Sequence, residues 1–179
     1  DNILITSGAT EAMYLALSAT AAPGRQFLVV DPSFLLYAPL IRMNGGEVKF
    51  IPTRPENGHQ LDPDDIIKNI SMRTFAVVLN SPNNPTGAVY PKSTIERIVE
   101  ECAFRGIQVF SDEVYDHLVL DDEEYSSVLS CGTDLDHLMC ISSFSKTYSM
   151  AGLRVGWIIS SQGAIKKLRR YHMFTTSVA

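Results

Sequence analysis

Short apolar runs alternate along the chain with stretches in which apolar residues recur at helical spacing. The apolar runs predict seven strands, at residues 3–6, 27–30, 47–51, 75–79, 107–110, 138–141 and 154–159. Helical patterns and helix-capping residues predict five helices between and after them, at residues 9–19, 33–43, 62–70, 91–105 and 162–172. The run at residues 75–79 contains no polar residue, which is typical of a strand buried on both faces.

This order of elements predicts the fold class. Strands that alternate with helices favour βαβ units and a mainly parallel sheet. We therefore expect an α/β fold with three α/β/α layers, and 179 residues are enough for one such domain with a sizeable core. Residues 116–136 form an acidic connection with Asp121, Asp122, Glu123 and Glu124, which we expect to be a solvated surface loop.

Composition narrows the classes of partner. The net charge is −5 without a long basic run, so we expect no nucleic-acid partner. No apolar stretch approaches the roughly 18 residues of a membrane span, and the polar start Asp1-Asn2 does not resemble a signal peptide. Because the chain lacks an initiator Met and both ends look cut, we expect residues 1–179 to be a single domain of a longer protein.

Cysteine and histidine residues do not form a recognisable site in the sequence. Cys102, Cys131 and Cys140 lack metal-ligand spacing, and their odd number argues against a complete disulfide framework. We interpret them as reduced, buried thiols of a cytoplasmic protein. The histidines lie outside every motif, so we predict surface or packing roles and no metal site for His59, His117, His137 and His172.

Polar or aromatic residues follow five of the predicted strands where each strand ends. They lie at residues 7–10, 31–34, 80–87, 111–113 and 142–146. In open α/β sheets, ligands bind outside the carboxyl ends of the strands. One polar turn would be weak evidence, but five together predict a binding site.

The residue types indicate what that site binds. Residues 7–10 enter a helix without a bulky side chain before Thr10, and such a helix start suits a phosphate. Ser143, Ser145 and Arg154 could complete an anion site, and Lys146 beside it could lose its proton and become a nucleophile. Asp112 at a buried strand end could hold a protonated ring nitrogen. Pyridoxal 5′-phosphate (PLP) needs this combination of groups.

Three motifs resemble the class I/II aminotransferases of PLP fold type I. They are Ser-Pro-Asn-Asn-Pro-Thr-Gly at residues 81–87, Ser-Asp-Glu-Val-Tyr at residues 111–115 and Ser-Phe-Ser-Lys at residues 143–146, with Arg154 eight residues after the lysine. The resemblance covers essentially the whole chain in the right order and spacing. It implies the large domain of that family, a seven-stranded mixed sheet whose seventh strand is antiparallel.

The resemblance also implies roles for individual residues. Lys146 carries PLP covalently and shuttles a proton, and Asp112 pairs with the pyridine nitrogen. Phe34 stacks on the ring, while Asn84 and Tyr115 hydrogen-bond its phenolic oxygen. The phosphate is held by Ala9, Thr10, Ser143 and Arg154, with Ser145 a weaker candidate. Catalysis is thus assigned to Lys146, Asp112 and Tyr115.

The implied activity is transfer of an amino group between an amino acid and a 2-oxo acid, in a homodimer. The family's N-terminal segment and its C-terminal small domain, which carries the arginine for the substrate carboxylate, are absent from this chain, as is any residue lent by a partner subunit. A PLP-dependent C–S lyase or synthase of the same fold remains an alternative. So does the ligand-sensing domain of a transcription regulator, which binds PLP without turnover.

Overall fold

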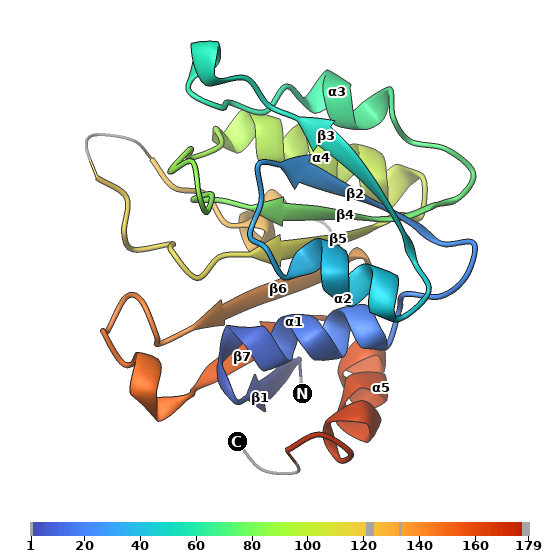
Figure 1. The fold of residues 1–179 in the computed structure, drawn as a ribbon, viewed down its shortest axis with the longest axis vertical. Helices are drawn as coiled ribbons and strands as arrows, with labels where there is room; N and C mark the ends of the chain where they lie inside the picture. Colours follow the sequence, from blue (N-terminus) through green and yellow to red (C-terminus); the bar gives the residue numbers. More distant parts are fainter. Residues whose placement is uncertain (1, 121–123, 133, 177–179) are drawn as a thin grey trace.

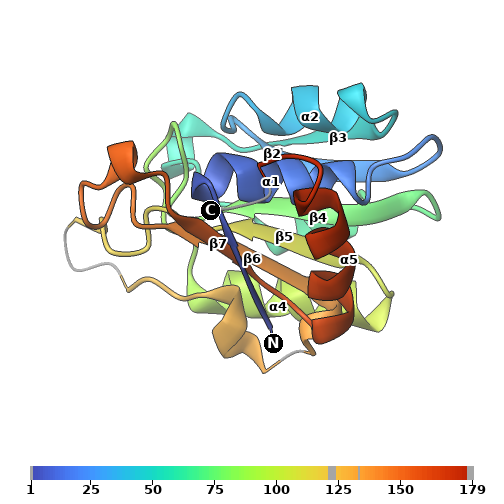
Figure 2. The same cartoon turned by 90° about the horizontal axis from the view of Figure 1, so that it is seen from below.

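Seven strands form one mixed sheet between two layers of helices (Figures 1 and 2). The computed structural model describes residues 2–120, 124–132 and 134–176. The strands are β1 (Ile3–Thr6), β2 (Gln26–Asp31), β3 (Glu47–Pro52), β4 (Thr74–Asn80), β5 (Gln108–Asp112), β6 (Leu138–Ser143) and β7 (Gly156–Ile159). They lie in the order β1-β7-β6-β5-β4-β2-β3, with β7 antiparallel to both neighbours and every other pair parallel. The predicted fold class and the antiparallel seventh strand are confirmed.

Helices cover both faces of the sheet (Figure 2). On one side lie α1 (Gly8–Ser18), α2 (Tyr37–Met43) and α5 (Gln162–His172), and on the other α3 (Pro63–Ile67) and α4 (Lys92–Phe104). The starts of α3 and α5 are capped by the Asp62 and Ser161 side chains, which accept backbone N–H bonds there. No helix among the described residues is long and apolar enough to cross a membrane.

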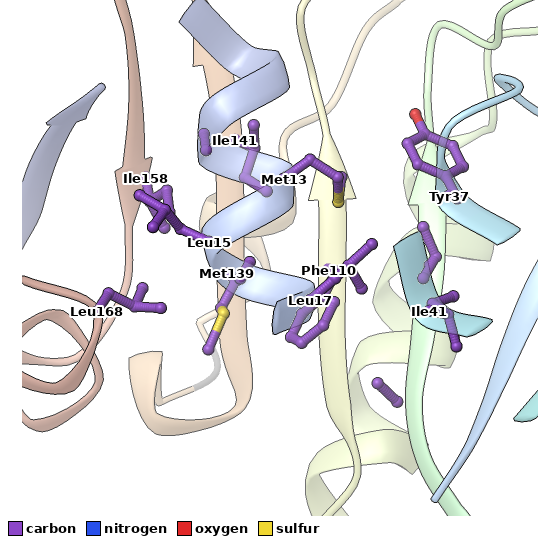
Figure 3. Packing of buried hydrophobic residues seen from close by; sticks show 14 of the residues in the cluster. Met13, Leu15, Leu17, Tyr37, Ile41, Phe110, Met139, Ile141, Ile158 and Leu168 are labelled. Carbon is purple, nitrogen blue, oxygen red and sulfur yellow. The ribbon is translucent and has the colours of Figure 1, made fainter. Parts of the chain in front are cut away.

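The central strands are mainly apolar because each contributes to two cores. On β4, Ala76 and Val78 pack under α1 and α2, whereas Val77 and Leu79 pack against α4. The same alternation on β2, β5 and β6 separates the two clusters, as expected where successive side chains point to opposite faces. Figure 3 shows the first cluster, in which side chains of α1 and α2 meet those of β5, β6 and β7.

Several predicted boundaries differ from the structure by one to four residues, and three of the differences are informative. Helix α2 begins at Tyr37 rather than at residue 33, because Pro39 has no N–H and is tolerated only in the first turn of a helix. Helix α3 ends at Ile67, and residues 68–70 continue only as turns. The seventh strand begins at Gly156, two residues after Arg154, whose left-handed backbone (φ 54°, ψ 52°) is incompatible with a strand.

The connection at residues 116–136 is only partly the solvated loop that we predicted. Glu124 is exposed, but Val128 is buried in the core, and Asp121, Asp122 and Glu123 lie outside the described residues. The buried carboxylate of Glu113 holds this segment by accepting hydrogen bonds from the hydroxyls of Tyr125 (2.5 Å) and Ser127 (2.7 Å) and from the Val128 N–H (3.0 Å). Glu113 therefore attaches part of this connection to the end of β5.

Two of the three cysteines are buried, as predicted, and Cys131 is half-buried. All three thiols are free. Burial raises the pKa of Cys102 to about 12 and that of Cys131 to about 11, so both are protonated at neutral pH. Trp157 of β7 is only half-buried and packs edge-on against the exposed ring of Phe144.

Candidate active site

A cavity of about 230 Å³ lies at the carboxyl ends of the central strands. It brings together all ten residues that the sequence singled out, from five strand ends and from the turn before β7: Ala9, Thr10, Phe34, Asn84, Asp112, Tyr115, Ser143, Ser145, Lys146 and Arg154. Six further lining residues were not singled out: Met13, Leu36, Tyr37, Asn80, Val114 and Ala151. Asn80 already lay within the predicted range 80–87, and the other five lie within three residues of a predicted one, so extending the predicted set by three residues would have included them.

One end of the cavity is the start of α1, where two glycines allow a very close approach. A Cβ on Gly8 would lie 2.2 Å from Nη2 of Arg154, and Gly8 has a positive φ of 75°. A Cβ on Gly156 would lie 2.5 Å from the backbone carbon of Gly8 and 2.6 Å from the Ala9 nitrogen. Only glycine at both positions lets β7, Arg154 and the first turn of α1 meet.

Arg154 is fixed at this helix start by backbone acceptors. Its guanidinium donates from Nη2 to the Ser7 carbonyl (3.2 Å) and from Nη1 to the Ala151 carbonyl (3.0 Å). The first N–H groups of a helix have no intrahelical partner and carry a partial positive charge. A guanidinium beside such N–H groups forms a site for an anion with several oxygens, such as a phosphate.

Glu11 uses one of the N–H groups at this end. Its carboxylate accepts the Ser7 N–H (2.6 Å) and the hydroxyls of Thr175 and Thr176 (both 2.7 Å), with His172 Nε2 at 3.5 Å. Burial raises the pKa of Glu11, but these hydrogen bonds outweigh it and the net effect lowers the pKa. The carboxylate therefore stays charged, and the N–H groups from Gly8 onward remain for a ligand.

Asp112 lines the cavity from the last position of β5. The residue is buried, and its backbone carbonyl accepts the Asn80 Nδ2–H (2.9 Å), which ties the ends of β4 and β5 together. Its carboxylate accepts the Tyr37 hydroxyl (2.6 Å) and, weakly, the Val114 N–H (3.4 Å). Burial raises the pKa of Asp112 to about 6, although the bond from Tyr37 opposes this effect. A buried carboxylate with a raised pKa is stabilised by a cationic N–H partner, because a nearby positive charge favours its ionised form.

Three more predicted residues lie near one another on the cavity wall. Asn84 Nδ2 donates to the Tyr115 hydroxyl (3.3 Å), and Lys146 Nζ lies 5.6 Å from the centroid of the Tyr115 ring. Lys146 is an exposed residue in the turn after β6. The Phe34 ring is half-buried and meets Tyr37 edge-on, with ring centroids 5.7 Å apart.

The hydroxyls of the turn after β6 are arranged differently from one another. Ser143 Oγ is buried and accepts the Ser145 N–H (3.3 Å), whereas Ser145 is half-buried. Asn83 stabilises a turn: its Oδ1 accepts the N–H (3.2 Å) and the hydroxyl (2.9 Å) of Thr86. Across the described part of the chain, no group of three or more His, Cys, Asp or Glu side chains could hold a metal ion.

Comparison with known proteins agrees with this geometry. The family profile described as "Aminotransferase class I and II" matches residues 1–179. The aspartate aminotransferase of Pyrococcus abyssi is 33% identical over 98% of this chain and 45% of its own length. That of Thermotoga maritima is 36% identical over 99% and 47%. The crystal structure of an aromatic aminotransferase from Pyrococcus horikoshii superposes with a TM-score of 0.93 at 32% identity, over 98% of this chain and 47% of that one.

The chain thus spans about half the length of the curated relatives that it matches. The family match nevertheless extends from its first residue to its last, and the structural superposition covers 98% of the chain. This chain belongs to the class I and II aminotransferase family.

Proposed function

We propose that the protein is a PLP-dependent aminotransferase and that residues 1–179 are its cofactor-binding large domain. One observation carries the proposal. A single cavity contains an anion site at the start of α1, a lysine in the turn after β6 and a buried carboxylate at the end of β5. These are the three groups that PLP chemistry requires of a protein.

The groups of PLP fit the cavity one by one. The N–H groups from Gly8 onward and the Arg154 guanidinium suit the phosphate, with the hydroxyls of Thr10, Ser143 and Ser145 lining the same cavity. Asp112 suits the pyridine nitrogen. The absence of a Cβ on Gly8 leaves Arg154 room beside the helix start, where an alanine would displace it.

Each protein group then has a defined task. Arg154 and the start of α1 bind the phosphate, and Phe34 supports one face of the ring. Asp112 holds a proton at the ring nitrogen. With that proton in place, bound PLP would supply a sink for the electrons released at the substrate Cα.

The remaining groups act near the reacting bond. Asn84 and Tyr115 donate hydrogen bonds to the phenolic oxygen. The Lys146 amine attaches the cofactor and later moves a proton to and from the substrate Cα. Lys146 lines the cavity and is exposed, which supports this task, because the substrate must reach the same amine.

We further propose that the complete protein transfers amino groups between an amino acid and a 2-oxo acid, as a homodimer in the cytoplasm. The relatives named above act on aspartate or on aromatic amino acids according to their names, which supports transamination over lyase chemistry or ligand sensing. The substrate-carboxylate arginine is expected in the small domain that such relatives carry beyond the matched half.

Reductive trapping tests the proposal. The protein is mixed with PLP, its absorbance spectrum is recorded, and sodium borohydride is added before digestion and mass spectrometry. We expect a visible absorbance band and a PLP adduct on the peptide that contains Lys146, and neither in Lys146→Ala. Lys166→Ala, at an exposed lysine of α5, is the matched control and should retain both.

Substrate addition then separates the possible functions. An aminotransferase should lose the visible band with an amino acid and regain it with a 2-oxo acid. A lyase would release a 2-oxo acid and ammonia in repeated turnovers. A sensor would show the adduct without either change. No adduct on Lys146 in the complete protein would overturn the proposal.

A further inference from the structure

Tyr37 is the most deeply buried polar group of the cavity that the sequence did not single out. It lies in the first turn of α2, is 1% exposed, and belongs to the hydrophobic cluster beneath α1. Figure 3 shows its ring beside Ile41 of the next helical turn, with the hydroxyl directed away from that residue. A phenol in such a position needs a hydrogen-bond partner, because an unpaired buried hydroxyl is costly.

Its partner is the functional carboxylate. The Tyr37 hydroxyl donates to Oδ2 of Asp112 at 2.6 Å, across 75 residues of sequence. Among the residues that the structure describes, the other donor to this carboxylate is the Val114 N–H, which lies 3.4 Å from Oδ1. Oδ2 is therefore firmly held, whereas Oδ1 is weakly engaged and remains available to a ligand in the cavity.

The bond also affects the charge of Asp112. Burial favours the neutral carboxyl and raises its pKa most, the Tyr37 hydrogen bond and the Val114 N–H lower it, and the nearby Glu113 carboxylate raises it, with a net pKa of about 6. Tyr37 itself remains a donor, because burial and the neighbouring Asp112 raise its own pKa well above 10. The other ionisable groups of the cavity are Tyr115, Lys146 and Arg154. Among the residues that the structure describes, none of these three donates a hydrogen bond to the Asp112 carboxylate.

We propose that Tyr37 is a positioning residue for the reaction: its hydroxyl holds one oxygen of Asp112 so that the other faces the cavity as a charged acceptor. The proposal rests on the proposed function, in which Asp112 holds the proton of the ring nitrogen. Tyr37 does not reach the reacting atoms. It acts through Asp112, by fixing the orientation of the carboxylate and by keeping it ionised at a site where burial alone would favour the acid.

Tyr37→Phe removes the hydroxyl and retains the ring, and the ionisation of Asp112 is the direct readout. The carboxyl signals of ¹³C-labelled aspartate are titrated by NMR in the PLP-free protein. A hydrogen bond to a charged group is worth roughly 1.5–3 kcal/mol, so its loss should raise the pKa of Asp112 by about 1 to 2. Tyr90→Phe removes an equally buried phenol from the other core and should leave the Asp112 titration unchanged.

A second readout uses the loaded protein. With ¹⁵N-labelled PLP, the ring-nitrogen signal of Tyr37→Phe should move towards the position of neutral pyridine at a pH where the parent protein keeps it protonated. Lys146→Ala and borohydride trapping report separately on whether PLP is bound. If PLP fails to bind, the proposed function falls, while the titration of the PLP-free protein still decides the role of Tyr37.

The outcomes are unambiguous. An Asp112 titration that is the same in Tyr37→Phe and in the parent overturns the proposal even if transamination is impaired, because the effect would then be structural. If Tyr37→Phe does not fold, the unsubstituted protein provides the test. The hydroxyl proton of Tyr37 should give a strongly downfield signal that shifts as Asp112 titrates near pH 6, and a signal insensitive to that titration overturns the proposal.

Discussion

Replacing Asp112 by asparagine should make the PLP-free protein more stable above pH 6 while impairing its function. In the folded chain, burial raises the pKa of Asp112 from 3.8 to about 6. A carboxyl with a raised pKa favours folding when it is neutral, and that advantage is lost as the pH rises from the unfolded value to the folded one. Above pH 6 the folded protein therefore carries a charge that it would hold more easily if unfolded.

The size of the effect follows from the two pKa values. The difference of about 2 units corresponds to roughly 3 kcal/mol, because each unit is worth 1.36 kcal/mol. Asparagine has nearly the same shape, its oxygen can still accept the Tyr37 hydroxyl, and it carries no charge. We therefore expect Asp112→Asn to raise the free energy of unfolding by up to about 3 kcal/mol at pH 8 and by almost nothing below pH 4.

Urea denaturation of both proteins across this pH range measures the difference. Trp157 is the single tryptophan, and its contact with Phe144 makes its fluorescence a probe of the β7 edge of the sheet. With a urea dependence of about 2–3 kcal/mol per molar, the midpoint should rise by about 1 M at pH 8. If Asp112→Asn raises the free energy of unfolding equally at pH 4 and pH 8, or not at all at pH 8, the Asp112 carboxylate does not carry a costly buried charge in the PLP-free protein, and the reasoning is refuted.

Two further substitutions test how the site is supported. Gly156→Ala places a methyl group 2.5 Å from the Gly8 backbone, so we expect it to cost about 1–3 kcal/mol of stability and to weaken PLP binding. Gly163→Ala in α5, where the nearest atom to the new methyl group is 3.9 Å away, should be neutral or slightly stabilising. Urea denaturation and PLP titration of both variants measure these effects, and similar behaviour of the two would contradict the close-approach argument. Glu113→Gln replaces a carboxylate that only accepts hydrogen bonds by an amide that cannot accept from all the surrounding donors. We expect the free energy of unfolding to fall by about 1–3 kcal/mol and hydrogen exchange at the Val128 N–H to become faster. Unchanged exchange at that N–H would show that the carboxylate does not hold the segment.

Much of the fold could be predicted because it is encoded by local periodicity. Seven apolar runs and the helical patterns among them correspond to the strands and helices observed, apart from errors at their ends. Those errors arose where one residue overrode the pattern, as Pro39 does at the start of α2 and Arg154 before β7. Apolar spacing does not reveal where a proline is tolerated or where a left-handed residue interrupts a strand.

The members of the candidate site could also be predicted, since carboxyl ends of parallel strands converge and the motifs mark them. The ten residues named from the sequence line one cavity. The connection around Glu113 was less predictable. Its acidic residues indicated a solvated loop, whereas the buried carboxylate attaches part of it to the sheet edge.

The sequence by itself determined the alternation of elements, the two-sided burial of the central strands and the chemical types gathered at one edge. These properties depend on residues that are neighbours in the chain or share a regular period. The tertiary structure alone decided that Tyr37 donates to Asp112 and that Gly8 and Gly156 admit Arg154 to the start of α1. Such pairs join residues far apart in sequence, and their contact depends on strand order and on the exact packing of helices against the sheet, which no local pattern encodes.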